Sequence, residues 1–156
     1  MRHAKSDWSF DLEDHERPLN SRGQQAAKAM GDWLRAQNLQ PDQVLCSSAT
    51  RTRETLAGLD LTAPTRFSDV LYHAAPDTLL EELKSATGQT VLIVGHNPGI
   101  ALFANGLLAK PVDHRGFRDY PTCATLVARF EINTWQELTL AQGHAEAFMV
   151  PRELMS

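Results

Sequence analysis

The stretch Thr90-Val91-Leu92-Ile93-Val94-Gly95-His96-Asn97-Pro98-Gly99 gives the clearest indication of the fold. Its unbroken apolar run predicts a β-strand over residues 90–94 that is buried on both faces, as strands of parallel sheets are. Gly95 and Gly99 permit a tight turn, and Pro98 suits the first turn of a helix. The pattern is strand, turn and helix, and it places His96 directly after a strand.

The same pattern recurs upstream. Residues 44–46 predict a short buried strand, the turn at Ser47-Ser48 follows, and a helix begins near Ala49. Residues 65–68 predict another short strand, and Pro76 the start of another helix. A helix over residues 20–38, capped by Asn20 or Ser21, precedes them all. Strands that alternate with helices indicate an α/β domain, which we expect to span residues 1–156.

The remaining segments are less regular. Residues 122–130 are rich in β-forming side chains, and residues 135–140 are expected to pair with them as a hairpin through Asn133-Thr134. The segment from Ala145 is ambiguous, and residues 110–121 predict a polar loop. Residues 6–17 predict a loop over the site, in which three apolar side chains act as anchors or lid contacts: Trp8, Phe10 and Leu12.

The composition excludes several classes of protein. A net charge of -4, from 15 Lys+Arg and 19 Asp+Glu, argues against a nucleic-acid binder, so any anion site depends on local arginines. Cys46 and Cys123 lie far apart and form no CxxC motif, and Cys46 is expected to be a small buried residue. No apolar run approaches the roughly 20 residues that span a bilayer, and no signal peptide is evident. The default expectation is a cytoplasmic enzyme.

The turns at strand ends carry the candidate site. Arg2-His3 at the chain start, Arg51 after one predicted strand and His96 after another would meet in one crevice, because open α/β sheets bind ligands at the carboxyl ends of their strands. A neutral imidazole such as His3 can act as a nucleophile, and guanidinium groups match phosphoryl oxygens bidentately. The amides at the start of the helix near Ala49 would add further donors.

Each residue also has an ordinary structural interpretation. His3 could be a surface histidine near a frayed terminus, any one arginine a solvated surface residue, and His96 a capping residue. Arg53 is the weaker arginine, because a helix turns about 100° per residue and aims it elsewhere.

A metal site has little support. Its possible ligands are His3, His73, His96 and Cys46, but the chain has no HxH or HExxH spacing, and the partners are arginines rather than carboxylates. The chain also lacks GxxxxGK[ST], and neither cysteine lies in a glycine-rich loop closed by arginine.

Taken together, these motifs resemble the histidine phosphatase superfamily, and within it the SixA-type phosphohistidine phosphatases. The resemblance covers nearly the whole chain and rests on Arg2-His3-Ala4, Arg17-Pro18-Leu19, Arg22-Gly23, residues 47–55, Leu71-Tyr72-His73-Ala74 and Gly95-His96-Asn97-Pro98-Gly99.

The resemblance implies a phosphoglycerate mutase-like three-layer sandwich, in which helices flank a mixed and mostly parallel sheet. It implies that His3 accepts the phosphoryl group, and that Arg2, Arg51 and His96, with Asn97 as a further substrate contact, form the phosphate pocket. It implies neither a metal nor an organic cofactor.

The chain departs from the family in two ways. The family has an apolar strand immediately before its Arg-His motif, whereas Met1 stands directly before Arg2. We therefore expect a truncated first strand and a sheet that is open beside the site and, if the chain begins at Met1, a poorly fixed His3 and impaired activity. We also expect that Met1 is an internal or misassigned start. Mass spectrometry of the native protein tests the last expectation.

The second departure concerns the proton donor. Many members use a glutamate in the third stretch, where this chain has Leu71-Tyr72-His73, and Asp77 or Glu81 are the possible substitutes. General acid catalysis contributes roughly 10²–10⁴-fold, so a missing acid penalises alkyl esters more than phosphoramidates.

The sequence thus predicts a phosphatase that works through a phosphohistidine intermediate, with phosphohistidine on a partner protein as its substrate. The alternatives are a phosphatase of small phosphate esters and a catalytically impaired phosphate-binding module. No nucleic-acid or membrane partner is expected, and the sequence does not indicate the oligomeric state.

Overall fold

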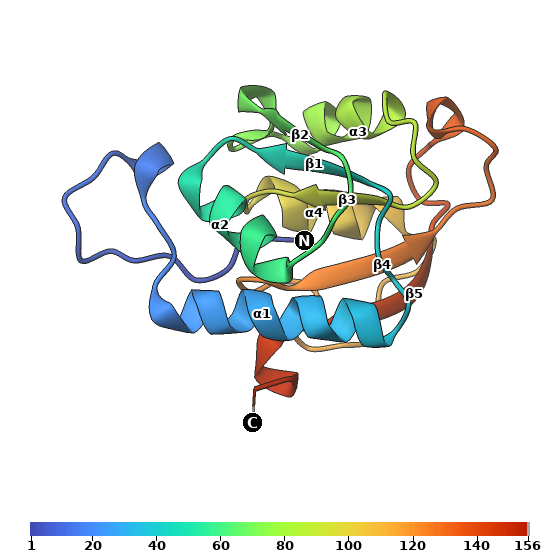
Figure 1. Ribbon diagram of the computed structural model, residues 1–156. Helices are drawn as coiled ribbons and strands as arrows, with labels where there is room; N and C mark the ends of the chain where they lie inside the picture. The colour runs from blue at the N-terminus through green and yellow to red at the C-terminus, as the bar shows by residue number, and fades with distance from the viewer. Residues whose placement is uncertain (156) are drawn as a thin grey trace.

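Three parallel strands form the central sheet in the computed structural model, which describes residues 1–155. Strand β1 (Gln43–Ser47) lies in the middle, between β2 (Thr65–Ser68) and β3 (Val91–Val94). Parallel neighbours need crossover connections. Here α2 (Thr50–Leu59) connects β1 to β2, and α3 (Pro76–Lys84) precedes β3 (Figure 1). The strands and helices predicted for this part of the chain are confirmed.

Helices cover both faces of this sheet. Successive side chains of a strand point to opposite faces, and β1 and β3 bury apolar side chains on both. Leu45 and Ile93 pack into the core formed with α3 and α4 (Gly99–Leu107). On the other face, Val44 and Val94 pack toward Leu56 of α2, and α1 (Ser21–Ala36) packs against α2 (Figure 1). This is the expected three-layer α/β arrangement. The Asn20 side chain caps α1 by accepting from the Gly23 N–H at 2.8 Å.

A separate antiparallel pair is formed by β4 (Thr125–Arg129) and β5 (His144–Met149). The predicted strand over residues 135–140 is wrong, because Trp135–Glu137 is a 3-10 helix. The Glu137 carboxylate accepts the backbone N–H groups of Asn133 and Thr134 and closes a capped turn there. The partner of β4 is instead the segment whose sequence was ambiguous. The other 3-10 helices are Asp14–Glu16, Asp69–Leu71 and Pro151–Glu153.

The first three residues occupy the space between β3 and β4. The Met1 amino group donates to the Ile93 carbonyl at 2.9 Å, and Arg2 forms a parallel bridge with Gly95. On the other side, the Arg2 N–H donates to the Ala124 carbonyl at 3.1 Å. The expectation that His3 is poorly fixed is wrong, because the His3 N–H also donates to the Gly95 carbonyl and the His3 carbonyl accepts from the Cys123 N–H.

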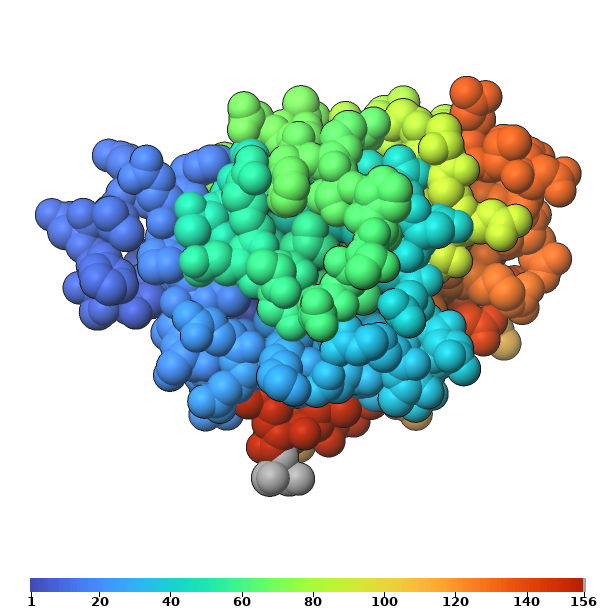
Figure 2. Space-filling model, in the orientation of Figure 1, coloured from blue at the N-terminus to red at the C-terminus, as the bar shows by residue number. Residues whose placement is uncertain are grey.

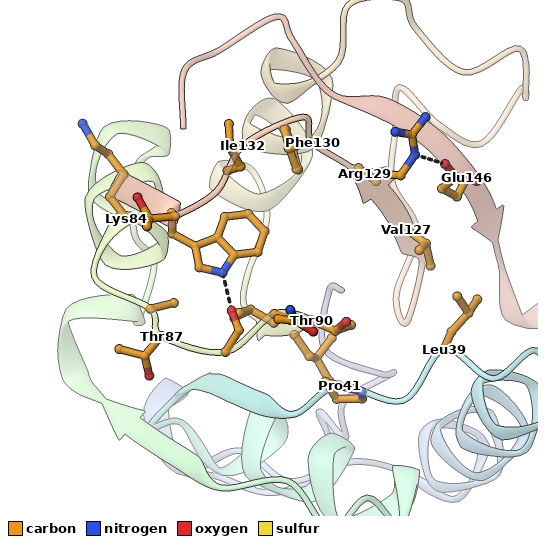
Figure 3. A pocket seen from close by; sticks show the side chains of 18 of the residues that line it. Leu39, Pro41, Lys84, Thr87, Thr90, Val127, Arg129, Phe130, Ile132 and Glu146 are labelled. Carbon is orange, nitrogen blue, oxygen red and sulfur yellow. Dashed lines mark hydrogen bonds and ion pairs between the residues drawn. The ribbon is translucent and has the colours of Figure 1, made fainter. Parts of the chain in front are cut away.

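A cavity of about 1070 Å³ lies beyond Met1, between β3 and β4. Figure 3 shows its walls, which include Thr90 and Pro41 on one side and Val127 and Phe130 on the other. The Trp135 indole N–H donates to the Gly88 carbonyl at 2.6 Å beside it. The sheet is thus open as expected, but at the start of β3 and not beside His96. This opening leaves the first half of β3 only partly buried.

Residues 6–17 form an irregular loop that projects from the side of the molecule (Figures 1 and 2). Its three apolar side chains do not act as buried anchors, because Trp8 is 77%, Phe10 57% and Leu12 47% exposed. Among residues 1–155, no helix combines the length and the apolar character that a membrane crossing requires.

Candidate active site

The carboxyl ends of β1 and β3 meet the N-terminal segment at one point. The ring centroids of His3 and His96 lie 5.3 Å apart there. The His3 N–H donates to the Gly95 carbonyl at 3.0 Å, and the Cys123 N–H donates to the His3 carbonyl at 2.9 Å. The Thr55 hydroxyl of α2 accepts the N–H of Ala4 at 2.9 Å. Segments that are distant in sequence therefore converge on His3, as the motif positions predict.

The His3 ring has one free nitrogen. Its Nδ1 lies 2.7 Å from the Ala4 carbonyl oxygen, which can only accept, so Nδ1 carries the proton. The Nε2 atom then holds a lone pair. Burial, followed by the charges of Arg51, Arg2 and Arg17, lowers the pKa of His3 to about 4. The imidazole is therefore neutral near pH 7 and has the form that a nucleophile needs.

Three arginines surround this imidazole. Arg2 and Arg51 were expected from the sequence, and Arg17 joins them, since each of the three charges depresses the pKa of His3. Arg51 is 1% and Arg17 6% exposed. All three Nε–H groups are buried without a partner within residues 1–155. Buried donors without acceptors are costly, so this arrangement suits a bound anion. The Arg17-Pro18-Leu19 motif was the available signal for Arg17.

Asp14 lies against the same arginines. Its carboxylate accepts from Arg17 at 2.6 Å and from Arg51 at 3.0 Å, and the Tyr72 hydroxyl and the His73 Nε2 atom also contact it. Burial alone would raise the pKa of Asp14, but these hydrogen bonds outweigh it and hold the pKa far below its usual range. Asp14 is therefore an ionised acceptor. Asp14 was not predicted as a site residue, because the segment around it shows neither helical nor strand periodicity.

His96 is 3% exposed. Its Nε2 atom lies 2.8 Å from the Ser47 hydroxyl at the end of β1, whereas Nδ1 is buried and has no partner within residues 1–155. Burial, followed by the Arg51 charge, lowers the pKa of His96 to about 2, so its ring is neutral. A neutral ring carries a single N–H.

Asn97 contacts the backbone of a neighbouring turn. Its Nδ2 atom donates to the carbonyls of Asp119 and Tyr120 at 3.1 and 3.0 Å, and Arg2 donates to the same Tyr120 carbonyl at 3.1 Å. Asn97 thus lies beside Arg2, with the donors of its side chain already used by backbone carbonyls.

Three charged residues considered from the sequence lie elsewhere. Arg53 donates to the Ser48 carbonyl at 2.8 Å and lies over the Phe67 ring at 4.1 Å, which agrees with its predicted direction. Asp77 and Glu81, the suggested proton donors, are exposed on α3. The residues near the expected donor position are Tyr72 and His73.

Tyr72 and His73 form an aromatic rim beside His96. Their ring centroids lie 5.3 Å and 4.9 Å from the His96 ring, and the His73 side chain is 49% exposed. Burial, followed by the hydrogen bond to Asp14, raises the pKa of Tyr72. In the sequence both residues belong to the Leu71-Tyr72-His73-Ala74 motif, and His73 was considered only as a possible metal ligand.

The charges of the site suit a dianion. Three guanidinium groups face the single Asp14 carboxylate and two neutral imidazoles, so two positive charges remain in excess. A dianionic phosphoryl group would balance these two charges and accept from the free donors. No group of three or more His, Cys, Asp and Glu side chains within residues 1–155 is placed to hold a metal ion.

Comparisons with known proteins show which family the chain resembles. The sequence profile of the histidine phosphatase superfamily (branch 1) matches residues 1–71. The chain is 38% identical to an uncharacterised protein of Mycobacterium tuberculosis (strain ATCC 25618 / H37Rv), with 97% of this chain and 100% of that protein covered.

Solved structures show the same similarity. A SixA phosphohistidine phosphatase assigned in Nakamurella multipartitia has a TM-score of 0.86 and 32% identity, covering 97% of this chain and 93% of that chain. The protein histidine phosphatase SixA complexed with tungstate has a TM-score of 0.80 at 20% identity, covers 99% of this chain and 96% of that chain, and supports the fold alone. The chain therefore belongs to the histidine phosphatase superfamily, in its SixA-type branch, and is a hydrolase.

Proposed function

We propose that this phosphatase removes the phosphoryl group from phosphohistidine on a partner protein, through an intermediate in which His3 carries the phosphoryl group. The observation that carries the proposal is a set of buried nitrogens without partners within residues 1–155: the Nε–H donors of Arg2, Arg17 and Arg51, and the Nδ1 atom of His96. Phosphoryl transfer is catalysed largely by positioning and by stabilising charge on the phosphoryl oxygens.

The reaction has two displacements. The His3 Nε2 lone pair attacks phosphorus, the bond from phosphorus to the substrate imidazole breaks, and the leaving imidazole takes a proton from solvent. Water then attacks phosphorus, the bond to Nε2 breaks, and inorganic phosphate leaves with the proton balance restored. In both steps the arginines and His96 hold the phosphoryl oxygens, and the Ala4 carbonyl holds the His3 ring in its reactive tautomer.

The acid–base groups favour a phosphoramidate over an alkyl ester. Hydrogen bonds keep the pKa of the Asp14 carboxyl far below its usual range, so this group has no proton to give near pH 7. The pKa of Tyr72 is raised, and its hydroxyl donates to Asp14. An alkoxide leaving group needs such a proton, whereas an imidazole leaving group needs less help.

The exposed loop supports a protein substrate over a small one. Trp8 and Phe10 are more than half exposed in a loop whose Asp14 end contacts Arg51. Exposed apolar side chains gathered near a polar site are typical of protein-binding surfaces. The second candidate, a phosphatase of small phosphate esters, would bury its substrate in a closed pocket.

Steady-state kinetics on three substrates tests the proposal. We expect kcat/KM for a phosphohistidine peptide to exceed that for the matching phosphoserine peptide by at least about 100-fold, the typical contribution of general acid catalysis. Preference for a small sugar phosphate over both peptides would contradict a protein substrate. A chromogenic aryl phosphate, whose leaving group needs no acid, serves as the control. Its turnover by wild type but not by His3→Ala separates an enzyme from an impaired binding module.

A further inference from the structure

Ser47 lies behind His96 and has no part in the reaction described above. It is the last residue of β1 and is fully buried. Its hydroxyl oxygen lies 2.8 Å from His96 Nε2 and accepts the Ala49 N–H at 3.3 Å. Within residues 1–155, these are the two hydrogen-bond contacts of that oxygen.

Only one tautomer of His96 satisfies both partners of the hydrogen bond between Ser47 and His96. If Nε2 carried the proton of His96, it would donate to the Ser47 oxygen, which already accepts from Ala49. The hydroxyl proton of Ser47 would then be buried with no acceptor, which is unfavourable. If the Ser47 hydroxyl instead donates to Nε2, the hydroxyl proton and the Nε2 lone pair are both paired, and the Nδ1–H of His96 is the one group left without a partner.

The position of the ring proton follows. Because burial and the Arg51 charge lower the pKa of His96, the ring is neutral and holds one proton. When Nε2 accepts from Ser47, that proton is on Nδ1. The Nδ1 atom is buried and has no hydrogen-bond partner within residues 1–155. The Nδ1–H group is therefore a hydrogen-bond donor whose acceptor would be an atom of a bound ligand.

We propose that Ser47 is a positioning residue that holds His96 in the tautomer protonated at Nδ1, so that this N–H is donated to a phosphoryl oxygen. The role in turnover rests on the proposed function, but the tautomer itself does not. Ser47 acts through His96 and does not contact the substrate. An ordinary structural role, in which Ser47 caps the start of α2 through Ala49, predicts no effect on the His96 proton.

The tautomer can be read directly by NMR. In protein with 15N-labelled histidine, two-bond couplings and 15N shifts show which ring nitrogen of each imidazole carries the proton. We expect His96 to be protonated at Nδ1 in wild type and in Ser48→Ala, and to move toward Nε2 protonation in Ser47→Ala. Ser48 is the matched control, because its hydroxyl contacts His15 and not His96. His96 protonated at Nε2 in wild type would overturn the proposal, whatever the activity of the protein.

A double-mutant cycle tests the effect on turnover. We expect Ser47→Ala to lower kcat/KM for a chromogenic aryl phosphate about tenfold, the effect of losing one oriented hydrogen bond. In a His96→Ala background the same change should have less than about a twofold effect, because the residue it orients is gone. An equal loss in both backgrounds would show that Ser47 acts independently of His96. If Ser47→Ala does not fold, the wild-type spectrum still decides the tautomer.

Discussion

The Arg51 guanidinium donates to Asp14 twice, at 2.6 Å to its backbone carbonyl and at 3.0 Å to its carboxylate. These two hydrogen bonds join the loop of residues 6–17 to helix α2 at the site. It also means that the carboxylate competes with a phosphoryl group for the same guanidinium.

Replacing this carboxylate should tighten anion binding. In Asp14→Asn the two arginines lose a negative neighbour, so we expect phosphate and tungstate to bind about fivefold more tightly, which corresponds to roughly 1 kcal/mol for a partly exposed ion pair. Isothermal titration calorimetry measures this. The control is Asp32→Asn, which removes the same charge from an exposed pair with Lys28 and Arg35. Weaker anion binding by Asp14→Asn would show that Asp14 organises the arginines and does not compete for them.

Arg51 and Arg53 offer a matched pair of arginines in one helix. Arg51→Lys keeps the charge but loses the planar, bidentate contact with phosphoryl oxygens, so we expect kcat/KM to fall about 10- to 100-fold. Arg53→Lys should stay within about twofold of wild type, because Arg53 lies over Phe67 and is largely solvent-exposed. Steady-state kinetics with an aryl phosphate measures both. Similar losses in the two variants would remove the phosphate-binding role from Arg51.

The ionisation of His3 should be displaced to acid pH. Its pKa is lowered to about 4 by burial and by the neighbouring arginines, whereas an exposed imidazole titrates near 6.5. We expect the Hε1 resonance of His3 to titrate with a midpoint near 4 in the free protein.

The same shift affects stability. The unfolded chain binds the proton first, so the contribution of His3 is fully present above about pH 6.5 and is lost as the pH falls toward 4. Between pH 6.5 and 5 the free energy of unfolding should therefore fall less steeply in His3→Gln than in wild type. A His3 midpoint near 6.5 would contradict both expectations.

Two glycines of α4 should respond in opposite directions to alanine. A Cβ atom at Gly99 would lie 1.8 Å from the Ala74 carbonyl oxygen, so Gly99→Ala must displace the backbone next to His73. We expect a loss of about 1–3 kcal/mol in the free energy of unfolding, with reduced activity. At Gly106 the nearest atom would be the Leu140 Cδ2 at 4.0 Å, and alanine there should stabilise the helix by up to about 1 kcal/mol. Urea unfolding of both variants compares them, and equal stabilities would refute the close packing at Gly99.

The sequence predicted the parts of the fold that local patterns determine. The apolar runs at β1 and β3 and the helical spacing around them identified the parallel sheet, and the turns after these strands identified His96 and Arg51. Strand β5 was not predicted, because it is a half-exposed strand whose pairing with β4 depends on residues distant in sequence.

The site was predicted only in part for the same reason. Asp14 meets Tyr72 across 58 positions of the chain, and an irregular loop has no periodicity that reveals such a contact. Ser47 was predicted to lie in a turn, but its hydrogen bond to His96 could not be predicted, because the two residues are 49 positions apart. Local sequence patterns indicate which strand ends carry chemistry, whereas the partners of each side chain depend on the tertiary fold.

The central claim is that His3 carries the phosphoryl group during turnover. Rapid quenching of the protein with a 32P-labelled aryl phosphate, followed by peptide mapping, tests it most directly. We expect one labelled peptide, phosphorylated at His3, with a linkage that is labile in acid and stable in base, and no label in His3→Ala. Labelling of another residue, or full turnover by His3→Ala, would contradict it.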